Sequence, residues 1–144
     1  MLAVKGVEAQ GSCPPNIGFE SGNFDHWQTY TGRIQVDGKL TLAVSAPSSS
    51  RHKLIKSPNH EIDFFGGFPV SCPNGSGYSI RLGNDSTGAE SERVSYTFSI
   101  PVGKNDYSLI YNYAVVLQNP EHQDFQQPRF TSRIFNVTDN QYVD

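Results

Sequence analysis

One stretch of this sequence alternates strictly between apolar and polar side chains, and it constrains the fold more than any other feature does. From residue 94 to residue 100 an apolar side chain stands at every second position, with Ser95, Thr97 and Ser99 between them. This two-residue period gives a β-strand one buried face and one solvated face. No segment repeats with the period of 3.6 residues that an amphipathic helix requires. The sequence therefore predicts an all-β fold.

A second pair of strands is indicated by a turn signal. Residues 33–36 and 39–44 alternate in the same way, and the dipeptide Asp37-Gly38 separates them. Two residues of this type between alternating runs are typical of a tight β-hairpin, because the turn needs positive φ angles. We expect an antiparallel hairpin here.

Residues 107–117 differ from these runs because nearly every side chain is apolar. Such a run suits a central strand that is covered on both faces. Residues 45–77, rich in Ser, Gly and Pro, are expected to form a long irregular region. Further strands are expected at residues 25–30, 78–82 and 129–137.

About eight short strands and one long loop predict a two-sheet, jelly-roll-like sandwich. The length of 144 residues allows one domain, which we place at residues 13–144. Residues 140–144 resemble a turn and the opening of another strand, so the sandwich is expected to lack its C-terminal strands. Residues 1–12 are expected to be disordered or to be a signal-peptide remnant, because Val7-Glu8-Ala9 offers a small residue at a cleavage position.

Composition narrows the classes of partner. The formal net charge is −3 and charged residues make up 17% of the chain. This balance argues against binding to a nucleic-acid backbone, which requires a basic surface. No apolar run approaches the roughly 20 residues of a membrane helix, so membrane insertion is not expected.

The only two cysteines are Cys13 and Cys72, each followed by proline. A disulfide between them would pin the N-terminal segment to the long loop and would place the protein outside the cytoplasm. The alternative is two unrelated thiols.

Aromatic and polar side chains suggest a carbohydrate site. Sugar-binding sandwiches commonly use an aromatic platform with polar groups around it. Trp27 and Tyr30 are the candidate platform, although a single tryptophan in a small β-domain is more often part of the core. The candidate polar ligands are Arg81, His122 and Asp124.

Oxygen-rich turns make calcium the one plausible cofactor. Residues 16–25 contain Asn23 and Asp25 among other oxygen donors, and residues 82–88 form a second such loop. Calcium takes carboxylate, amide and carbonyl oxygens. The alternative is that these side chains cap their own turns.

Catalysis is not expected. A Ser-His-Asp hydrolase on an α/β scaffold would need a G-x-S-x-G turn, which does not occur. A glycoside hydrolase would need two carboxylates in one cleft. The candidates for that less favoured reading are Glu90, Glu92, Glu121 and Asp124.

Several stretches together resemble a known group of proteins. They are residues 13–27, beginning Cys-Pro-Pro-Asn-Ile-Gly-Phe-Glu-Ser-Gly-Asn-Phe, residues 72–98, beginning Cys-Pro-Asn-Gly-Ser-Gly-Tyr-Ser-Ile-Arg-Leu-Gly-Asn-Asp, and residues 109–116 and 127–130. They resemble the N-terminal domain of large secreted surface proteins of gliding bacteria, which often carry PKD repeats and a C-terminal sorting domain. The resemblance implies an extracellular domain that is one piece of a longer polypeptide.

Residues 16–27 are also similar to the start of galactose-binding-like jelly rolls and related carbohydrate-binding modules. In those modules a glutamate in the position of Glu20 commonly ligates a structural calcium, so the resemblance adds Glu20 to Asn23 and Asp25. The expected function is a non-catalytic adhesion or carbohydrate-binding module at the cell surface. A ligand-free structural spacer or cap domain is the alternative, and a small hydrolase is the third reading.

Overall fold

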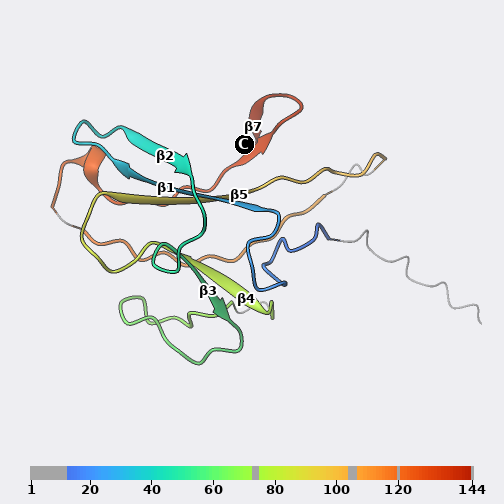
Figure 1. Cartoon of the computed structure of the whole chain (residues 1–144), viewed down its shortest axis with the longest axis horizontal. Coiled ribbons are helices and arrows are strands. Elements are labelled where there is room, and N and C mark those ends of the chain that lie inside the picture. Colours follow the sequence, from blue (N-terminus) through green and yellow to red (C-terminus); the bar gives the residue numbers. More distant parts are fainter. Residues whose placement is uncertain (1–12, 73–74, 104–106, 120, 144) are drawn as a thin grey trace, which may run out of the picture.

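The computed structural model of the chain describes residues 13–72, 75–103, 107–119 and 121–143. Within this part the fold is all-β, as predicted, with one three-residue 3-10 helix, η1 (Figure 1). In order, the elements are β1 (Trp27–Ile34), β2 (Leu40–Val44), β3 (His52–Lys56), β4 (Tyr78–Leu82), β5 (Glu90–Tyr96), η1 (Asp124–Gln126), β6 (Ile134–Asn136) and β7 (Gln141–Val143).

The strands form antiparallel sheets. One has three strands in the order β2-β1-β5, the second pairs β3 with β4, and the third is the short β6–β7 hairpin. In Figure 1 the three-stranded sheet lies above the β3–β4 pair, an arrangement that is consistent with a small sandwich and is not a closed barrel. The sandwich-like prediction is confirmed at this level.

The predicted hairpin is confirmed, but its first strand is longer than expected. Gly38 has φ +79° in the turn, and the Lys39 N–H donates to Asp37 Oδ1. The segments predicted at 25–30 and 33–36 merge into β1, because Gly32 does not interrupt the strand. A Cβ atom at Gly32 would lie 1.8 Å from the Thr41 carbonyl oxygen. The glycine therefore permits the close approach of two strands.

Two other boundaries were predicted incorrectly. Strand β3 lies inside residues 45–77, which were expected to be irregular. Its buried residues are His52 and Ile55, three positions apart, so the strand has no two-residue period to detect. Strand β5 begins at Glu90 and ends at Tyr96, four residues earlier than the alternating run. The pairing with β1 sets these limits, since Trp27 lies opposite Tyr96 and Arg33 opposite Glu90.

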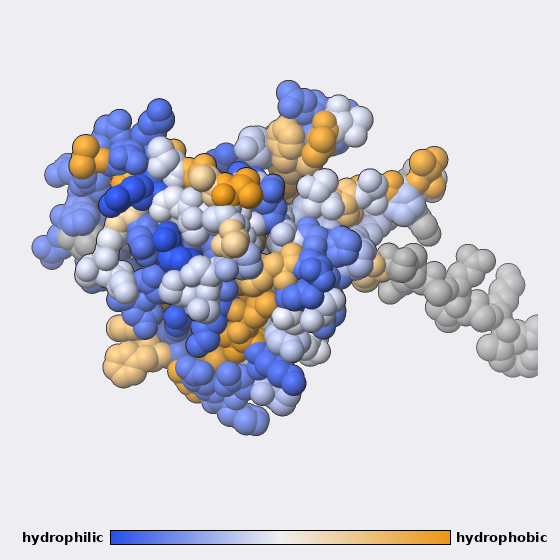
Figure 2. Space-filling view, viewed as in Figure 1, coloured by the Kyte–Doolittle hydropathy of each residue, from blue (hydrophilic) through white to orange (hydrophobic). Residues whose placement is uncertain are grey.

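The prediction of a covered central strand at residues 107–117 is wrong in this structure. Every residue of the segment is exposed, and none belongs to a strand. The physical reason is that no described strand forms backbone hydrogen bonds with it. The strand predicted at 129–137 is likewise reduced to Ile134–Asn136. Figure 2 shows apolar side chains reaching the surface in a band between the upper sheet and the lower strand pair.

The buried core is small, and its aromatic part lies at the start of β1. Phe19 and Ile55 are the only buried hydrophobic residues in the described part of the chain. Phe19 stacks on Trp27 with ring centroids 4.4 Å apart, and Tyr96 meets the same indole edge-on at 5.1 Å. This aromatic cluster anchors the N-terminal turn to the three-stranded sheet.

The predicted disulfide is also wrong, because Cys13 and Cys72 are not joined. Each lies in a segment with its own attachment. The Tyr96 hydroxyl holds the N-terminal segment by donating to the Pro15 carbonyl oxygen, and the Ser71 hydroxyl ties the β3–β4 connection to the Asn59 carbonyl oxygen. The expectation for residues 1–12 lies outside the described residues.

Candidate functional site

The turn at residues 14–25 is built around the side chain of Asn16, which is 6% exposed. Its φ of +57° is a conformation that asparagine tolerates better than most residues. The amide nitrogen donates to the carbonyl oxygens of Asn23 and Asp25, at 3.2 and 2.8 Å, and to Asn23 Oδ1 at 3.3 Å. The amide oxygen accepts from the Ser21 N–H at 2.9 Å. One buried side chain therefore closes the whole turn.

Trp27 is attached to this turn. Its indole N–H donates to the Asn16 carbonyl oxygen at 2.8 Å, and Phe19 covers one face of the ring. Tyr96 lies against the indole edge, and its hydroxyl is 2.6 Å from the Pro15 carbonyl oxygen. Burial raises the pKa of Tyr96, and the nearby Glu20 carboxylate raises this pKa further. Trp27 is thus part of the anchoring cluster.

The same tryptophan lines an open groove of about 640 Å³ between the turn and the sheet edge. Ser45 contributes a buried hydroxyl that makes no hydrogen bond within the described residues. Asn23 and Asp25 line the same groove and are exposed, so amide and carboxylate groups stand beside an aromatic wall, a mixture that suits a polyhydroxylated ligand. The lining residues are Gly22, Asn23, Phe24, Asp25, Trp27, Gln28, Thr29, Val44, Ser45, Pro47 and Leu54.

Tyr30 does not join Trp27 in one platform. Alternation along β1 places Trp27 and Tyr30 on opposite faces of the sheet. The Tyr30 hydroxyl donates to Gln28 Oε1 at 2.6 Å, and the Arg93 guanidinium lies 4.8 Å from the ring centroid. The ring of Tyr30 therefore already has a cationic partner on its own face.

The other three predicted ligands lie outside this groove. Arg81 is on β4 and makes a long contact of 3.8 Å with the exposed Asp85. His122 and Asp124 belong to the segment around η1, which Phe125 packs against Gly38 in the β1–β2 turn. Because Trp27 begins β1 and Gly38 follows its end, the length of that strand, roughly 25 Å, separates the two regions.

The predicted calcium ligands are partly brought together. Asn23 and Asp25 lie side by side, with Asn23 Nδ2 donating to Asp25 Oδ2 at 2.8 Å. Glu20 Oε1 instead accepts from the Gly18 N–H at 3.0 Å. Asn23 Oδ1 accepts from the Asp25 N–H, so these side chains cap their own turn in this structure. In the described part of the chain, no group of three or more His, Cys, Asp or Glu side chains could hold a metal ion.

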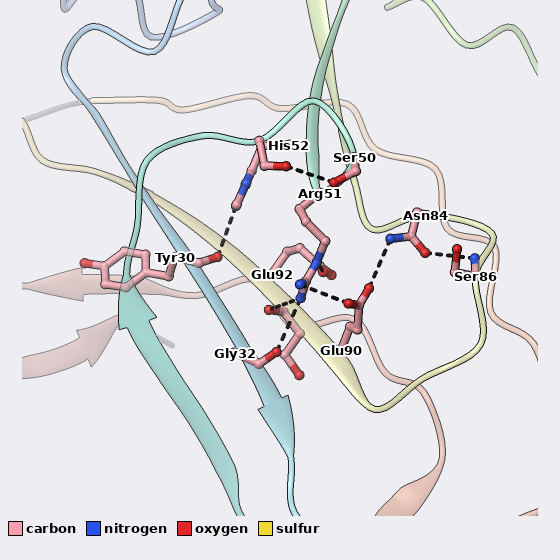
Figure 3. A network of polar contacts seen from close by, with 11 residues as sticks. Tyr30, Gly32, Ser50, Arg51, His52, Asn84, Ser86, Glu90 and Glu92 are labelled. Atoms are coloured by element: carbon pink, nitrogen blue, oxygen red, sulfur yellow. Dashed lines mark hydrogen bonds and ion pairs between the residues drawn. The ribbon is translucent and has the colours of Figure 1, made fainter.

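A polar network that sequence reasoning missed joins the two main sheets (Figure 3). Arg51, next to β3, forms ion pairs with Glu90 and Glu92 on β5. Its guanidinium also donates to the carbonyl oxygens of Gly32 and Ser91. The neighbouring His52, 2% exposed, places Nε2 3.0 Å from the Tyr30 carbonyl oxygen. No local pattern around Arg51 indicates this role, because its partners are some 40 residues away.

Glu90 and Glu92 were also candidates for a hydrolytic carboxylate pair. Both accept from Arg51, and Glu90 additionally accepts from Asn84 Nδ2 at 3.0 Å. Arg51 and Glu90 line a second, open groove of about 610 Å³ along the β1–β2 hairpin. Because both carboxylates are paired with Arg51, their arrangement favours a structural role, linking the sheets, over a catalytic role in proton transfer.

Comparison of the chain with protein-family models, with curated proteins and with solved structures gave no significant match. The resemblance to surface proteins of gliding bacteria therefore rests on the sequence stretches quoted above. The search for membrane spans found no helix, among the described residues, with the length and apolar character that a crossing requires.

Proposed function

We propose that this protein is a non-catalytic binding module that recognises carbohydrate through the groove beside Trp27. The observation that carries the proposal is the composition of that groove, in which Trp27 stands with the exposed polar residues Asn23 and Asp25. Sugars present apolar ring faces and many hydroxyl groups, so aromatic and hydrogen-bonding surfaces bind them together. The groove is open, which suits an internal stretch of a polymer better than an enclosed small molecule.

The test is retention of the protein by a panel of neutral and acidic polysaccharides. Asp25 lines the groove and is exposed, so the Asp25→Ala variant should keep the fold and weaken retention about tenfold, the equivalent of one lost hydrogen bond. Asp37→Ala is the matched control, because Asp37 is exposed, accepts one hydrogen bond within its turn as Asp25 does, and lies outside the groove. Retention by no polysaccharide, or equal loss in both variants, would contradict the proposal.

A ligand-free spacer is the second candidate, and one observation favours it. Phe19 already occupies one face of Trp27, and the indole N–H is already bonded to Asn16. A tryptophan used in this way stabilises the turn whether or not a ligand binds. Failure of the whole polysaccharide panel would favour the spacer.

Calcium belongs to the proposal as a structural ion at the Asn16 turn. The carbonyl oxygens of Asn23 and Asp25, with Asn23 Oδ1, surround Asn16 Nδ2 within 3.3 Å. These are ligand types that calcium prefers. A cation there would take the place of the Asn16 amide donor. The Glu20 carboxylate, which now accepts from Gly18, would have to turn to join them.

Asn16→Asp tests the calcium component. The new carboxylate faces three oxygen acceptors, so this variant should melt lower than wild type in chelator. Added calcium should restore its thermal midpoint, because a ligand that binds only the folded state stabilises it. If calcium moves neither midpoint, the calcium component is removed and the carbohydrate component stands.

An extracellular location and membership of a longer surface polypeptide complete the proposal. They are supported by the small-residue cleavage pattern at Val7-Glu8-Ala9 and by the sequence resemblance. Labelling of the protein on intact cells by a membrane-impermeant reagent would test the location, and labelling only after the cells are broken would contradict it.

A further inference from the structure

We infer that residues 107–117 are an interaction strand that pairs with the same segment of a second copy of this chain. The pairing is antiparallel, about a two-fold axis close to Asn112. This inference does not depend on the proposed carbohydrate site.

The backbone of the segment is available for pairing. In the described part of the chain, no backbone N–H or C=O group between Tyr107 and Leu117 makes a hydrogen bond. The segment also belongs to no strand. An exposed row of unpaired backbone groups is the template on which another strand adds.

The apolar area of the segment matches a specific interface. Eight large apolar side chains of this segment are exposed, among them Ile110 at 84% and Tyr113 at 65%. With about 150–220 Å² for each residue, their exposed fractions amount to roughly 800 Å². This equals the area that one partner contributes to a standard interface, and it exceeds the largest apolar patch of an ordinary monomer, about 300–600 Å².

Charge makes a second copy a suitable occupant. Residues 107–118 contain no Asp, Glu, Lys, Arg or His. In an antiparallel pair about Asn112, a charge at any position off the axis would face an uncharged residue of the other copy and would lose its hydration without gaining a partner. Here that penalty is absent.

The side-chain order is also self-complementary. The rings of Tyr111 and Tyr113 stack at 5.3 Å, which places these two residues on one side of the strand. With Asn112 on the two-fold axis, Tyr111 of one copy lies opposite Tyr113 of the other. Leu109 then faces Val115, and the large Ile110 faces the small Ala114. Aromatic and aliphatic cross-strand pairs of this kind stabilise antiparallel sheets.

Sedimentation of the full chain tests the inference. The wild-type protein should sediment as a dimer at micromolar concentration. Val115→Lys should shift it to a monomer, with the dimer at least tenfold weaker, because the new charge would face Leu109 of the other copy. Val36→Lys is the matched control, since Val36 is a 92% exposed valine that follows β1. The control should remain a dimer.

Cross-linking tests the register in a background with both native cysteines changed to serine. Asn112→Cys should form an intermolecular disulfide on mild oxidation, since residues on the axis face their own copy. Ser108→Cys should not, because eight residues of antiparallel register separate the two positions by about 26 Å.

Three results would overturn the inference: a wild-type monomer, a dimer that Val115→Lys leaves intact, or open-ended aggregation in place of a closed dimer. A wild-type monomer whose amides at 107–117 are protected from hydrogen exchange would show that another part of the chain covers the segment. Loss of the dimer with unchanged polysaccharide retention would separate this surface from the proposed function.

Discussion

Asn16 makes four hydrogen bonds through one buried amide, and these bonds close the turn that carries Trp27. The backbone of Asn16 also has a left-handed conformation. One residue therefore bends the chain and supplies the hydrogen bonds that hold the bend. Sequence alone identified residues 16–25 as an oxygen-rich turn. It did not single out Asn16, because three asparagines or aspartates in one turn are equivalent until their directions are known.

Replacing Asn16 with alanine should therefore destabilise the protein by about 2–4 kcal/mol, since several buried polar groups lose their partner. Asn140→Ala is the matched control. Asn140 has nearly the same φ, +52°, but is exposed and makes no side-chain hydrogen bond within the described residues. This control measures the cost of placing alanine in a left-handed backbone conformation, which we expect to destabilise the protein by about 1 kcal/mol. Urea unfolding of both variants measures the difference, and equal losses would contradict the role of the amide.

Tyr96 gives a prediction on pH. Burial, and secondarily Glu20, raise the pKa of its phenol above the ordinary 10.0, so the folded state favours the neutral form. The resulting stability is complete below pH 10 and is lost as the pH rises above it. The thermal midpoint of the wild-type protein should fall as the pH rises above 10, and that of Tyr96→Phe should fall less over the same range. At pH 7 the phenol is neutral in both states. The difference in thermal midpoint between Tyr96→Phe and wild type then measures only the lost hydrogen bond to the Pro15 carbonyl oxygen. A fall of equal steepness in both proteins would contradict the assignment.

At the scale of elements, Arg51 links two sheets that share no backbone pairing. Its partner Glu92 has a side chain only 10% exposed, so removal of the guanidinium leaves a largely buried charge without its partner. Arg51→Met should destabilise the protein by about 3 kcal/mol.

Arg81→Met is the control for this prediction. The Arg81–Asp85 contact is long and both side chains are exposed, so its loss should change stability by less than about 1 kcal/mol. Chemical denaturation of the two variants provides the comparison. Equal destabilisation would show that Arg51 is no more important than a surface arginine.

The strands that sequence could predict are those whose signal is local. The Asp37-Gly38 turn and the run at residues 78–82 carry their own pattern, and both form as predicted. Strand β3 was missed because its buried residues are three positions apart. The end of β1 was misplaced because Gly32 can mark either a break or a close contact, and only the neighbouring Thr41 carbonyl decides between them.

At the scale of the whole molecule, few large side chains are enclosed. Two buried hydrophobic residues, in the part of the chain that is described, are a small core for 144 residues. The apolar run at 107–117 led sequence reasoning to a covered strand, because an apolar segment normally means burial. Phe98 and Phe130 contact its tyrosine rings, but no described strand pairs with its backbone, and composition cannot reveal which surface covers it.

The candidate site was predicted only in part, because its residues also depend on contacts that lie far apart in the sequence. Asn23, Asp25 and Trp27, which the sequence assigned to two different roles, line one groove because they are close in sequence. Tyr30 is excluded from a platform with Trp27 by strand alternation, which its position within a continuous β1 determines. His122 and Asp124 were predicted as ligands because they share one polar loop. That loop packs against the β1–β2 turn, at the other end of β1 from Trp27.

Trp27 is the only tryptophan in the chain, so intrinsic fluorescence reports directly on the groove that it lines. The most direct test is a titration of the protein with the polysaccharide that retains it best, followed at the tryptophan emission band. We expect a saturable shift in emission, with a midpoint about tenfold higher for Asp25→Ala and unchanged for Asp37→Ala. An emission spectrum that stays constant while the polymer binds would place the binding surface elsewhere and would contradict the central claim.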